Sequence, residues 1–373
     1  VVCLEMQFRT LIAALRTRSG IFACLGLLVL FLRILAGWMP NVVESVYSKG
    51  FFVGVRYLLD YTIGWCPFPF SYLLIVAIVA HWVRKVLRNR PRPSRPIKEK
   101  LKKAAANILG FVGAALFFFF MLWGFNYKRV PIEQHLGLKL DSLDVETLCR
   151  EAEWAGRLAE RERAAIRGIS NDSVSMEMLP DQLEDEIRSC VGKAMDKMGY
   201  PMHGRIRGRM INPGGWMLRI GISGIYNPFT GEGNVTGAQT PQKIPFTMAH
   251  EMSHACGFGD EGTCNFIGMV ACGFSEDPFV RYSGQIGYWG HLVNALGEVD
   301  PAMSKMLVSV MDPGIKADLR ANYNNYQRYH GKISELGNKV NNAYLNAQGV
   351  AGGIKSYDRV VVLRAAWHKK TGN

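Results

Sequence analysis

Three apolar stretches limit what the N-terminal third of this chain can form. They cover residues about 20–38, 68–86 and 106–125, and each is close to the roughly 20 residues that a helix needs to cross a bilayer. Tryptophans mark their ends, as interfacial anchors do, at Trp38, Trp65, Trp82 and Trp123. A cleaved signal peptide is the alternative for the first stretch, but no small-residue cleavage site precedes Pro40. The pattern predicts a membrane region over residues 1–128 with three spans.

The basic residues predict the direction of these spans. Loops rich in lysine and arginine stay in the cytoplasm. The tract between the second and third stretches, residues 84–103, carries Arg84, Lys85, Arg88, Arg90, Arg92, Arg95, Lys98, Lys100, Lys102 and Lys103, and Arg9, Arg16 and Arg18 precede the first. The linker 41–66 is nearly balanced in charge. We therefore expect a multi-pass protein of the bacterial inner (cytoplasmic) membrane, with residues 129–373 on the periplasmic, extracytoplasmic side.

The distribution of charge argues against a nucleic-acid partner. Residues 1–129 hold 18 Lys+Arg and 4 Asp+Glu, a balance of +14, and the whole chain has 44 against 31, or +13. Residues 130–373 therefore carry 26 against 27, or −1. The positive charge belongs to the membrane region and its lipid surroundings. The second part lacks the basic stripe that binds nucleic acid.

The rest of the chain, residues 129–373, is long enough for one domain. Amphipathic, charge-rich patterns predict helices over Val145–Ile169 and Leu179–Met198. Glycines and β-branched residues predict strands and turns over Ile206–Val235, and further helices follow through Leu345. This predicts a mainly α domain with a small sheet.

One motif in this domain points to chemistry. Residues His250 to His254 have the sequence His-Glu-Met-Ser-His, in a segment that we expect to be helical because Pro245 suits a first turn and Gly257 a stop. Two imidazoles four residues apart share a helix face, so both can bind one Zn²⁺. The glutamate between them, Glu251, can reach the water that the metal activates. The spacing predicts a zinc site.

A catalytic zinc needs a third protein ligand. Asp260 and Glu261 are the candidates. With Asp260, the pattern is that of a metzincin with aspartate in place of the third histidine. With Glu261, the ligand lies at the start of a second helix. We favour Glu261, because the apolar run to Phe274 suits a buried helix and no later methionine announces the turn that metzincins need. Asp260 would then cap this helix.

These residues carry a resemblance to a known family. His250–Phe266 and the upstream run Gly221–Val235 resemble an uncharacterised family of bacterial membrane-anchored proteins with zinc metallopeptidase motifs, H-E-x-x-H followed by E-x-x-A-N. His250, Glu251, His254, Glu261 and Asn265 fall on motif positions; Cys264 replaces the usual alanine and Thr263 an acidic residue. The resemblance implies three transmembrane helices followed by a zincin-like metallopeptidase domain of the glutamate-zincin (gluzincin) type, mainly α (α+β), with its sheet beside the H-E-x-x-H helix.

The expected reaction is hydrolysis of a peptide or protein substrate. Glu251 would act as general base. The donor to the oxyanion is open among Tyr282, His291, His330 and Tyr357, with Tyr282 the first choice because it follows the Glu261 helix. Leu218–Tyr226 would form the strand to which substrate adds.

Two further expectations bear on the site. The chain has eight cysteines, five of them in the second part, and we expect buried thiols there, with no disulfide and no cysteine ligand to zinc. The alternative to an enzyme is a catalytically inactive binding or scaffold module at the membrane. The intact Glu251 argues against that alternative.

Overall fold

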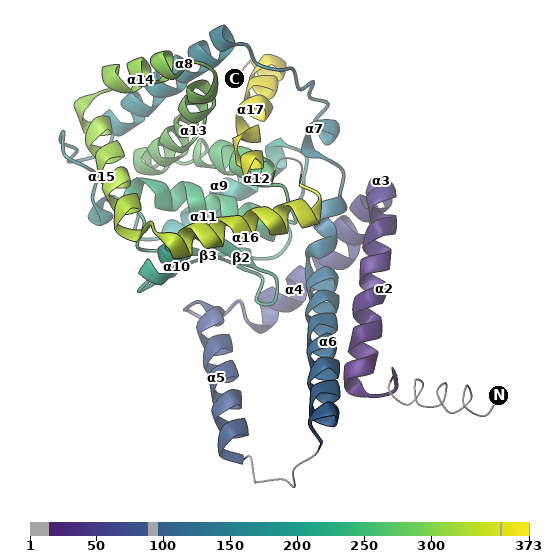
Figure 1. The fold of residues 1–373 in the computed structure, drawn as a ribbon. Helices are drawn as coiled ribbons and strands as arrows, with labels where there is room; N and C mark the ends of the chain where they lie inside the picture. Colours follow the sequence, from purple (N-terminus) through teal and green to yellow (C-terminus); the bar gives the residue numbers. More distant parts are fainter. Residues whose placement is uncertain (1–14, 89–95, 351–352, 373) are drawn as a thin grey trace. The chain divides into compact units, whose positions relative to one another are not determined.

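The structure is a computed structural model that describes residues 15–88, 96–350 and 353–372. The described residues form two compact units (Figure 1). One consists of residues up to Val55 and of Phe70–Val130; the other consists of Arg56–Pro69 and of Pro131 onward. Of the residues used above for topology, Arg9, Arg90, Arg92 and Arg95 lie outside the described ranges.

Three helices of the first unit are long and apolar enough to cross a membrane: α2 (Arg18–Trp38), α5 (Phe70–Arg88) and α6 (Ile97–Leu122). The prediction of three such helices is confirmed. Short helical segments follow α2 and α6, where no helix was predicted: α3 (Pro40–Val42), the π-helix η1 (Val43–Phe51), α4 (Phe52–Thr62) and the 3₁₀ turn η2 (Gly124–Lys128). The membrane that α2, α5 and α6 would cross, and the direction in which they would cross it, remain predictions.

Helices α2 and α6 pack closely because small residues face each other. A Cβ on Gly26 of α2 would lie 2.5 Å from the α-carbon of Gly113 of α6. One helical turn away, a Cβ on Gly110 would lie 2.6 Å from the α-carbon of Ser19. Small residues at such spacing let two membrane helices approach to backbone contact.

The second unit is mostly helical. Its helices are α7 (Ile132–His135), α8 (Val145–Ala164), α9 (Leu183–Lys197), α10 (Gly215–Arg219), α11 (Ile244–Ala255), α12 (Glu261–Cys272), α13 (Pro278–Val299), α14 (Pro301–Val310), α15 (Pro313–Tyr329), α16 (Lys332–Gln348) and α17 (Arg359–Thr371). The 3₁₀ turns are η3 (Met176–Met178), η4 (Pro241–Lys243) and η5 (Gly353–Asp358). The predicted mainly helical domain is confirmed at this level.

A mixed sheet of three strands packs on α11. Its order is β1 (Arg207–Ile211), β3 (Glu232–Thr236) and β2 (Gly224–Asn227), with β1 parallel and β2 antiparallel to β3. All three strands contact α11, whose other neighbours are α9, α12 and α13. The strand expected over Leu218–Tyr226 is wrong in its first part, because α10 runs to Arg219 and the strand begins at Gly224.

The segment Arg56–Pro69, from the loop between the first two spans, packs within the second unit. The guanidinium of Arg56 is 1% exposed and donates to the carbonyl of Gly231, at 2.7 Å, in the turn between β2 and β3. Asp60 pairs with Arg56 at 2.5 Å and accepts from the main-chain N–H of Arg205 at 2.8 Å. This part of the loop therefore supports the sheet under α11.

Candidate metal centre

Helix α11 is buried along nearly its whole length between the sheet and α12. It begins after η4, with Pro245 in its first turn, and it ends before Gly257, whose φ of 85° is left-handed. Ten of its twelve residues are buried. Such burial is unusual for two histidines and a glutamate. Buried polar side chains lose their hydration, and this costs free energy unless hydrogen bonds or ion pairs compensate for it.

Three side-chain atoms converge from α11 and α12. The Nε2 atoms of His250 and His254 lie 3.1 Å apart, and Glu261 Oε2 lies 3.0 Å from the first and 3.4 Å from the second. The edges of a tetrahedral zinc site with bonds of 2.0–2.1 Å are roughly 3.3–3.4 Å long. His250, His254 and Glu261 are all buried and form a group of described residues that could hold a metal ion, called the metal group below.

The outer nitrogens of both imidazoles are bound to acceptors. His250 Nδ1 lies 2.7 Å from Asn265 Oδ1, and His254 Nδ1 lies 2.7 Å from the carbonyl oxygen of Phe258. Because the amide oxygen of Asn265 and the carbonyl oxygen of Phe258 can only accept a hydrogen bond, each Nδ1 carries the hydrogen. The lone pair of each Nε2 is left for a metal, which is the arrangement of metal-bound histidine in proteins.

Charge within the group favours an ionised Glu261. Burial by itself works against the carboxylate, but the His254 and His250 imidazoles hold the pKa of Glu261 far below its usual value. Burial also works against the charged form of His254, yet the ionised Glu261 beside it holds its pKa well above the usual value. A metal binds the carboxylate and the neutral imidazole, so binding would displace a proton from His254.

Asp260 is occupied at the start of α12. Its carboxylate accepts from the main-chain N–H and the hydroxyl of Thr263, at 2.8 and 2.7 Å, and pairs with Arg359 at 2.6 Å. Asp260 is therefore the N-cap of α12, the helix that begins with Glu261, and its predicted role as a helix cap is confirmed.

Glu251 lies between the metal group and the sheet. A Cβ on Gly224 of β2 would lie 2.9 Å from its Cδ, and one on Gly233 of β3 would lie 2.7 Å from its Cβ. The main-chain N–H of Tyr226 donates to the carboxylate. Its Oε2 is buried and has no hydrogen-bond partner among the described residues. Burial raises the pKa of Glu251, as suits a group that takes up a proton.

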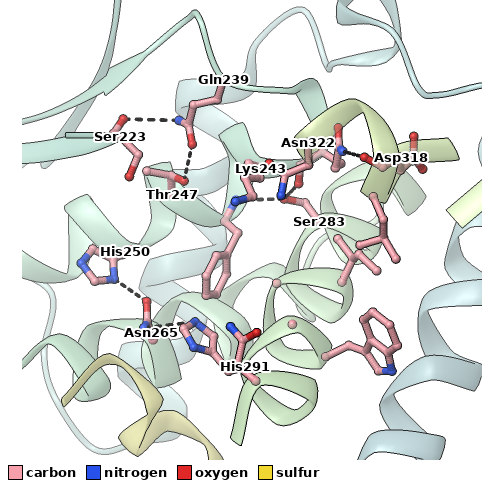
Figure 2. A pocket seen from close by; sticks show the side chains of 18 of the residues that line it. Ser223, Gln239, Lys243, Thr247, His250, Asn265, Ser283, His291, Asp318 and Asn322 are labelled. Atoms are coloured by element: carbon pink, nitrogen blue, oxygen red, sulfur yellow. Dashed lines mark hydrogen bonds between the residues drawn. The ribbon is translucent and has the colours of Figure 1, made fainter. Parts of the chain in front are cut away.

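A cavity of about 460 Å³ lies beside the metal group (Figure 2). His250, Glu251 and Asn265 line one part of it, and η4, α13 and α15 provide much of the rest. His291 of α13 also lines it. Its Nε2 accepts from Asn265 Nδ2 at 3.4 Å, and its Nδ1 lies 2.8 Å from Asp358 Oδ1. A hydrogen-bonded chain thus runs from His250 through Asn265 and His291 to Asp358.

The other residues considered as oxyanion donors lie elsewhere. The hydroxyl of Tyr282 is fully buried and donates to Asp318 Oδ2 at 2.7 Å, and Tyr282 does not line the cavity. His330 lies in a neighbouring pocket, 3.4 Å from Glu335. The side chain of Tyr357 is outside the described residues. The structure therefore brings His291, and not Tyr282, to the cavity beside the metal group.

The seven cysteines in the described ranges form no disulfide; Cys3 lies outside these ranges. Cys264 contacts His254 at the ring nitrogen that does not face the metal group: its Sγ lies 3.3 Å from His254 Nδ1. Burial raises the pKa of its thiol to about 12, so it is neutral at physiological pH.

Several residues of the site were not predicted. Asp358 and Arg359, adjacent at the start of α17, hold His291 and Asp260. Gly233 packs against α11, and Lys243 lines the cavity. A charged Asp-Arg pair before an apolar run is the one sequence signal of α17, and it is too common to mark a site.

Comparison with known proteins identifies the family. The chain matches the family described as "Protein of unknown function (DUF3810)" over residues 47–364. No curated protein and no solved structure matches it. The match covers most of the chain, including the apolar helices α5 and α6 and the residues His250, His254 and Glu261, and the expected membership of an uncharacterised family is confirmed. The chain belongs to the DUF3810 family of proteins of unknown function.

Proposed function

We propose that the second unit is a zinc-dependent hydrolase of peptide bonds. The observation that carries this proposal is the convergence of His250 Nε2, His254 Nε2 and Glu261 Oε2, with both Nδ1 atoms already bound to acceptors. A set of two histidines and one glutamate leaves one position open, as in catalytic zinc sites. Nitrogen and carboxylate donors in a compact group suit Zn²⁺.

A zinc ion in this group would polarise the substrate carbonyl and lower the pKa of water towards neutrality. Glu251 is proposed to take a proton from the attacking water and to return it to the leaving amine. Its partnerless, buried Oε2 is available for this proton, while the Tyr226 N–H and the glycines beside it fix the carboxylate in place.

His291 is proposed as the donor to the oxyanion, in place of Tyr282. It lines the same cavity as Glu251, and Asp358 fixes its ring through Nδ1. Its Nε2 is on the side of Asn265. In the protonated form of the ring, this Nε2–H would donate to the negative charge that develops on the carbonyl oxygen, an interaction whose loss typically costs 10²–10³-fold in kcat.

The peptide substrate is proposed to lie along β2. This strand is at the edge of the three-stranded sheet, and Gly224 at its start lines the cavity next to Glu251. An exposed edge can bind an extended peptide by main-chain hydrogen bonds.

We also propose that the catalytic unit lies outside the cytoplasm, at the bacterial inner membrane. The balance of basic residues on either side of the three apolar helices supports this location. Protease added to spheroplasts should then digest the second unit and spare a tag inserted near Pro93. Protection of the second unit would place the site in the cytoplasm.

The hydrolase proposal is tested by cleavage of a diverse peptide pool. The full-length chain and its Glu251→Gln variant are purified in detergent, loaded with zinc to the same stoichiometry and incubated with the pool. Loss of the general base should slow cleavage by about 10²–10⁴-fold. Equal rates for the two proteins would reject the enzyme and favour a binding module with the same fold.

A further inference from the structure

Lys243 lies at the end of the cavity that is remote from the metal group. It lines both this cavity and a smaller one of about 200 Å³, which also share Ser223, Gln239 and Asn322. Figure 2 shows Lys243 among polar side chains on the far side of the cavity from His250 and His291. Lys243 is thus one of four residues that line both cavities.

The ammonium group of Lys243 has no hydrogen bond and no ion pair with any described residue. Its main-chain N–H donates to the carbonyl of Thr240 at 3.0 Å. The side chain of Lys243 is exposed to solvent. Because Lys243 lines both cavities and has no ion-pair partner among the described residues, its ammonium group is free to pair with an anion of a bound ligand.

The position of this lysine in the fold is also unfavourable without a ligand. Lys243 is the residue before the first turn of α11, where its side chain makes no capping bond and where no acidic residue follows. Aspartate, asparagine, serine and threonine stabilise such a position, and a cation opposes the helix dipole. A local rule broken without compensation in the fold is typical of functional residues.

The other charged groups of the cavity are accounted for. Asp318 is bound by Arg163 at 2.8 Å, by Tyr282 at 2.7 Å and by the main-chain N–H of Val174 at 2.7 Å. Glu251 faces the metal group. Asn322, which has no hydrogen bond from its side-chain amide in the described residues, lines both cavities with Lys243. The region thus offers an ammonium without an ion pair and an amide, while the carboxylate of Asp318 is already paired with Arg163.

We propose that Lys243, assisted by Asn322, binds a carboxylate of the substrate, so that the enzyme selects acidic peptides. This inference rests on the proposed function and assigns its substrate class. The carboxylate is either an aspartate or glutamate side chain or the C-terminus of the peptide. Lys243 precedes His250 by seven positions, about 10 Å along a helix. At about 3.3 Å per residue of extended peptide, the carboxylate lies about three residues from the scissile bond.

The test measures binding, so that it does not depend on turnover. Fluorescent ten-residue peptides with one aspartate, moved along an otherwise neutral sequence, are titrated against the zinc-loaded, full-length Glu251→Gln protein. Each peptide has two partners, one with asparagine in place of aspartate and one with a C-terminal amide. Charge-assisted contacts predict about ten- to hundredfold weaker binding when the recognised carboxylate is removed. If the asparagine peptide binds more weakly, Lys243 binds the aspartate side chain; if the amidated peptide binds more weakly, Lys243 binds the C-terminal carboxylate.

Variants in the same background attribute the preference to the lysine. Lys243→Gln should abolish it, Lys243→Arg should retain most of it, and Lys243→Glu should shift it towards peptides with lysine at the same position. Lys305→Gln, an exposed lysine of α14 that lines neither cavity, should change nothing. Zinc content checks that each variant is folded. The inference would be overturned if zinc-loaded Lys243→Gln kept the preference for the carboxylate peptide, or if the Glu251→Gln protein with Lys243 intact showed no such preference. Binding with this preference but no cleavage by the wild type would instead reject only the hydrolase.

Discussion

The α-carbon of Gly224 lies against the carboxylate of Glu251, so close that a methyl group there would come within 2.9 Å of Cδ. The obstructing atoms belong to the end of a flexible side chain. In Gly224→Ala the carboxylate should therefore move while the fold is kept. A displacement of about 1 Å can cost 10²-fold in rate. We expect a loss of peptide cleavage of that order, with zinc content and melting temperature close to those of the wild type.

Gly233 provides the matched comparison on the neighbouring strand. A methyl group there would meet Cβ of Glu251 at 2.7 Å and its main-chain carbon at 3.0 Å. Because backbone cannot swing aside, Gly233→Ala should push α11 from the sheet and destabilise the unit by about 1–3 kcal/mol. Thermal unfolding of both variants checks this contrast. Equal melting temperatures, or an unaffected rate in Gly224→Ala, would contradict the packing described here.

A second prediction separates the two oxyanion donors considered. Tyr282→Phe removes a buried hydrogen bond to Asp318, which should lower stability by about 1–2 kcal/mol and leave kcat nearly unchanged. His291→Gln should lower kcat by about 10²–10³-fold at similar stability. Initial rates at saturating peptide, with melting curves, decide between them. A large loss of kcat in Tyr282→Phe with normal turnover in His291→Gln would identify Tyr282, and not His291, as the donor to the oxyanion.

A third prediction concerns pH and the contact between α8 and α13. Burial works against the charge of Glu162, but Arg161 and Arg281 hold its pKa below the usual value. Arg281 Nε lies 2.7 Å from Glu162 Oε2. Because the folded-state pKa is the lower one, this contribution is complete above the unfolded pKa of about 4.3 and is lost as pH falls through the folded value.

Glu162→Gln should therefore lower the stability at neutral pH by about 1–2 kcal/mol and should flatten the fall of melting temperature below about pH 4.5. Glu153→Gln is the control, because its partner Arg157 is exposed on the same helix and 3.7 Å away. Exposed pairs of this kind contribute about 0.3–0.5 kcal/mol. Melting curves that are parallel over the acid range in the wild type and Glu162→Gln would reject this role of Glu162.

The parts predicted from sequence are those set by local spacing. The apolar helices follow from the length of their apolar runs. His250 and His254 meet because four residues make about one helical turn, and Glu261 joins them because a short connection ends at the first turn of α12. None of these needs knowledge of tertiary contacts.

The parts that were missed depend on contacts between distant residues. His291 reaches Asn265 from 26 residues away and is held by Asp358, a further 67 residues along. Both candidates, Tyr282 and His291, are on α13, and only the rotation of that helix decides which one faces the cavity. Likewise, Arg56 is in a loop between two apolar segments, and its contact with Gly231 spans 175 residues. Spacing in the sequence carries no information on such contacts.

The central claim is that His250, His254 and Glu261 hold one catalytic zinc ion, and zinc stoichiometry tests it most directly. The full-length chain and its Glu251→Gln, Asp260→Ala and Glu261→Ala variants are equilibrated with zinc, desalted and assayed for metal per chain. The wild type, Glu251→Gln and Asp260→Ala should each retain one ion, because Glu251 is a base and Asp260 a helix cap. Glu261→Ala should retain almost none. Full zinc in Glu261→Ala with loss in Asp260→Ala, or no zinc in the wild type, would contradict the site.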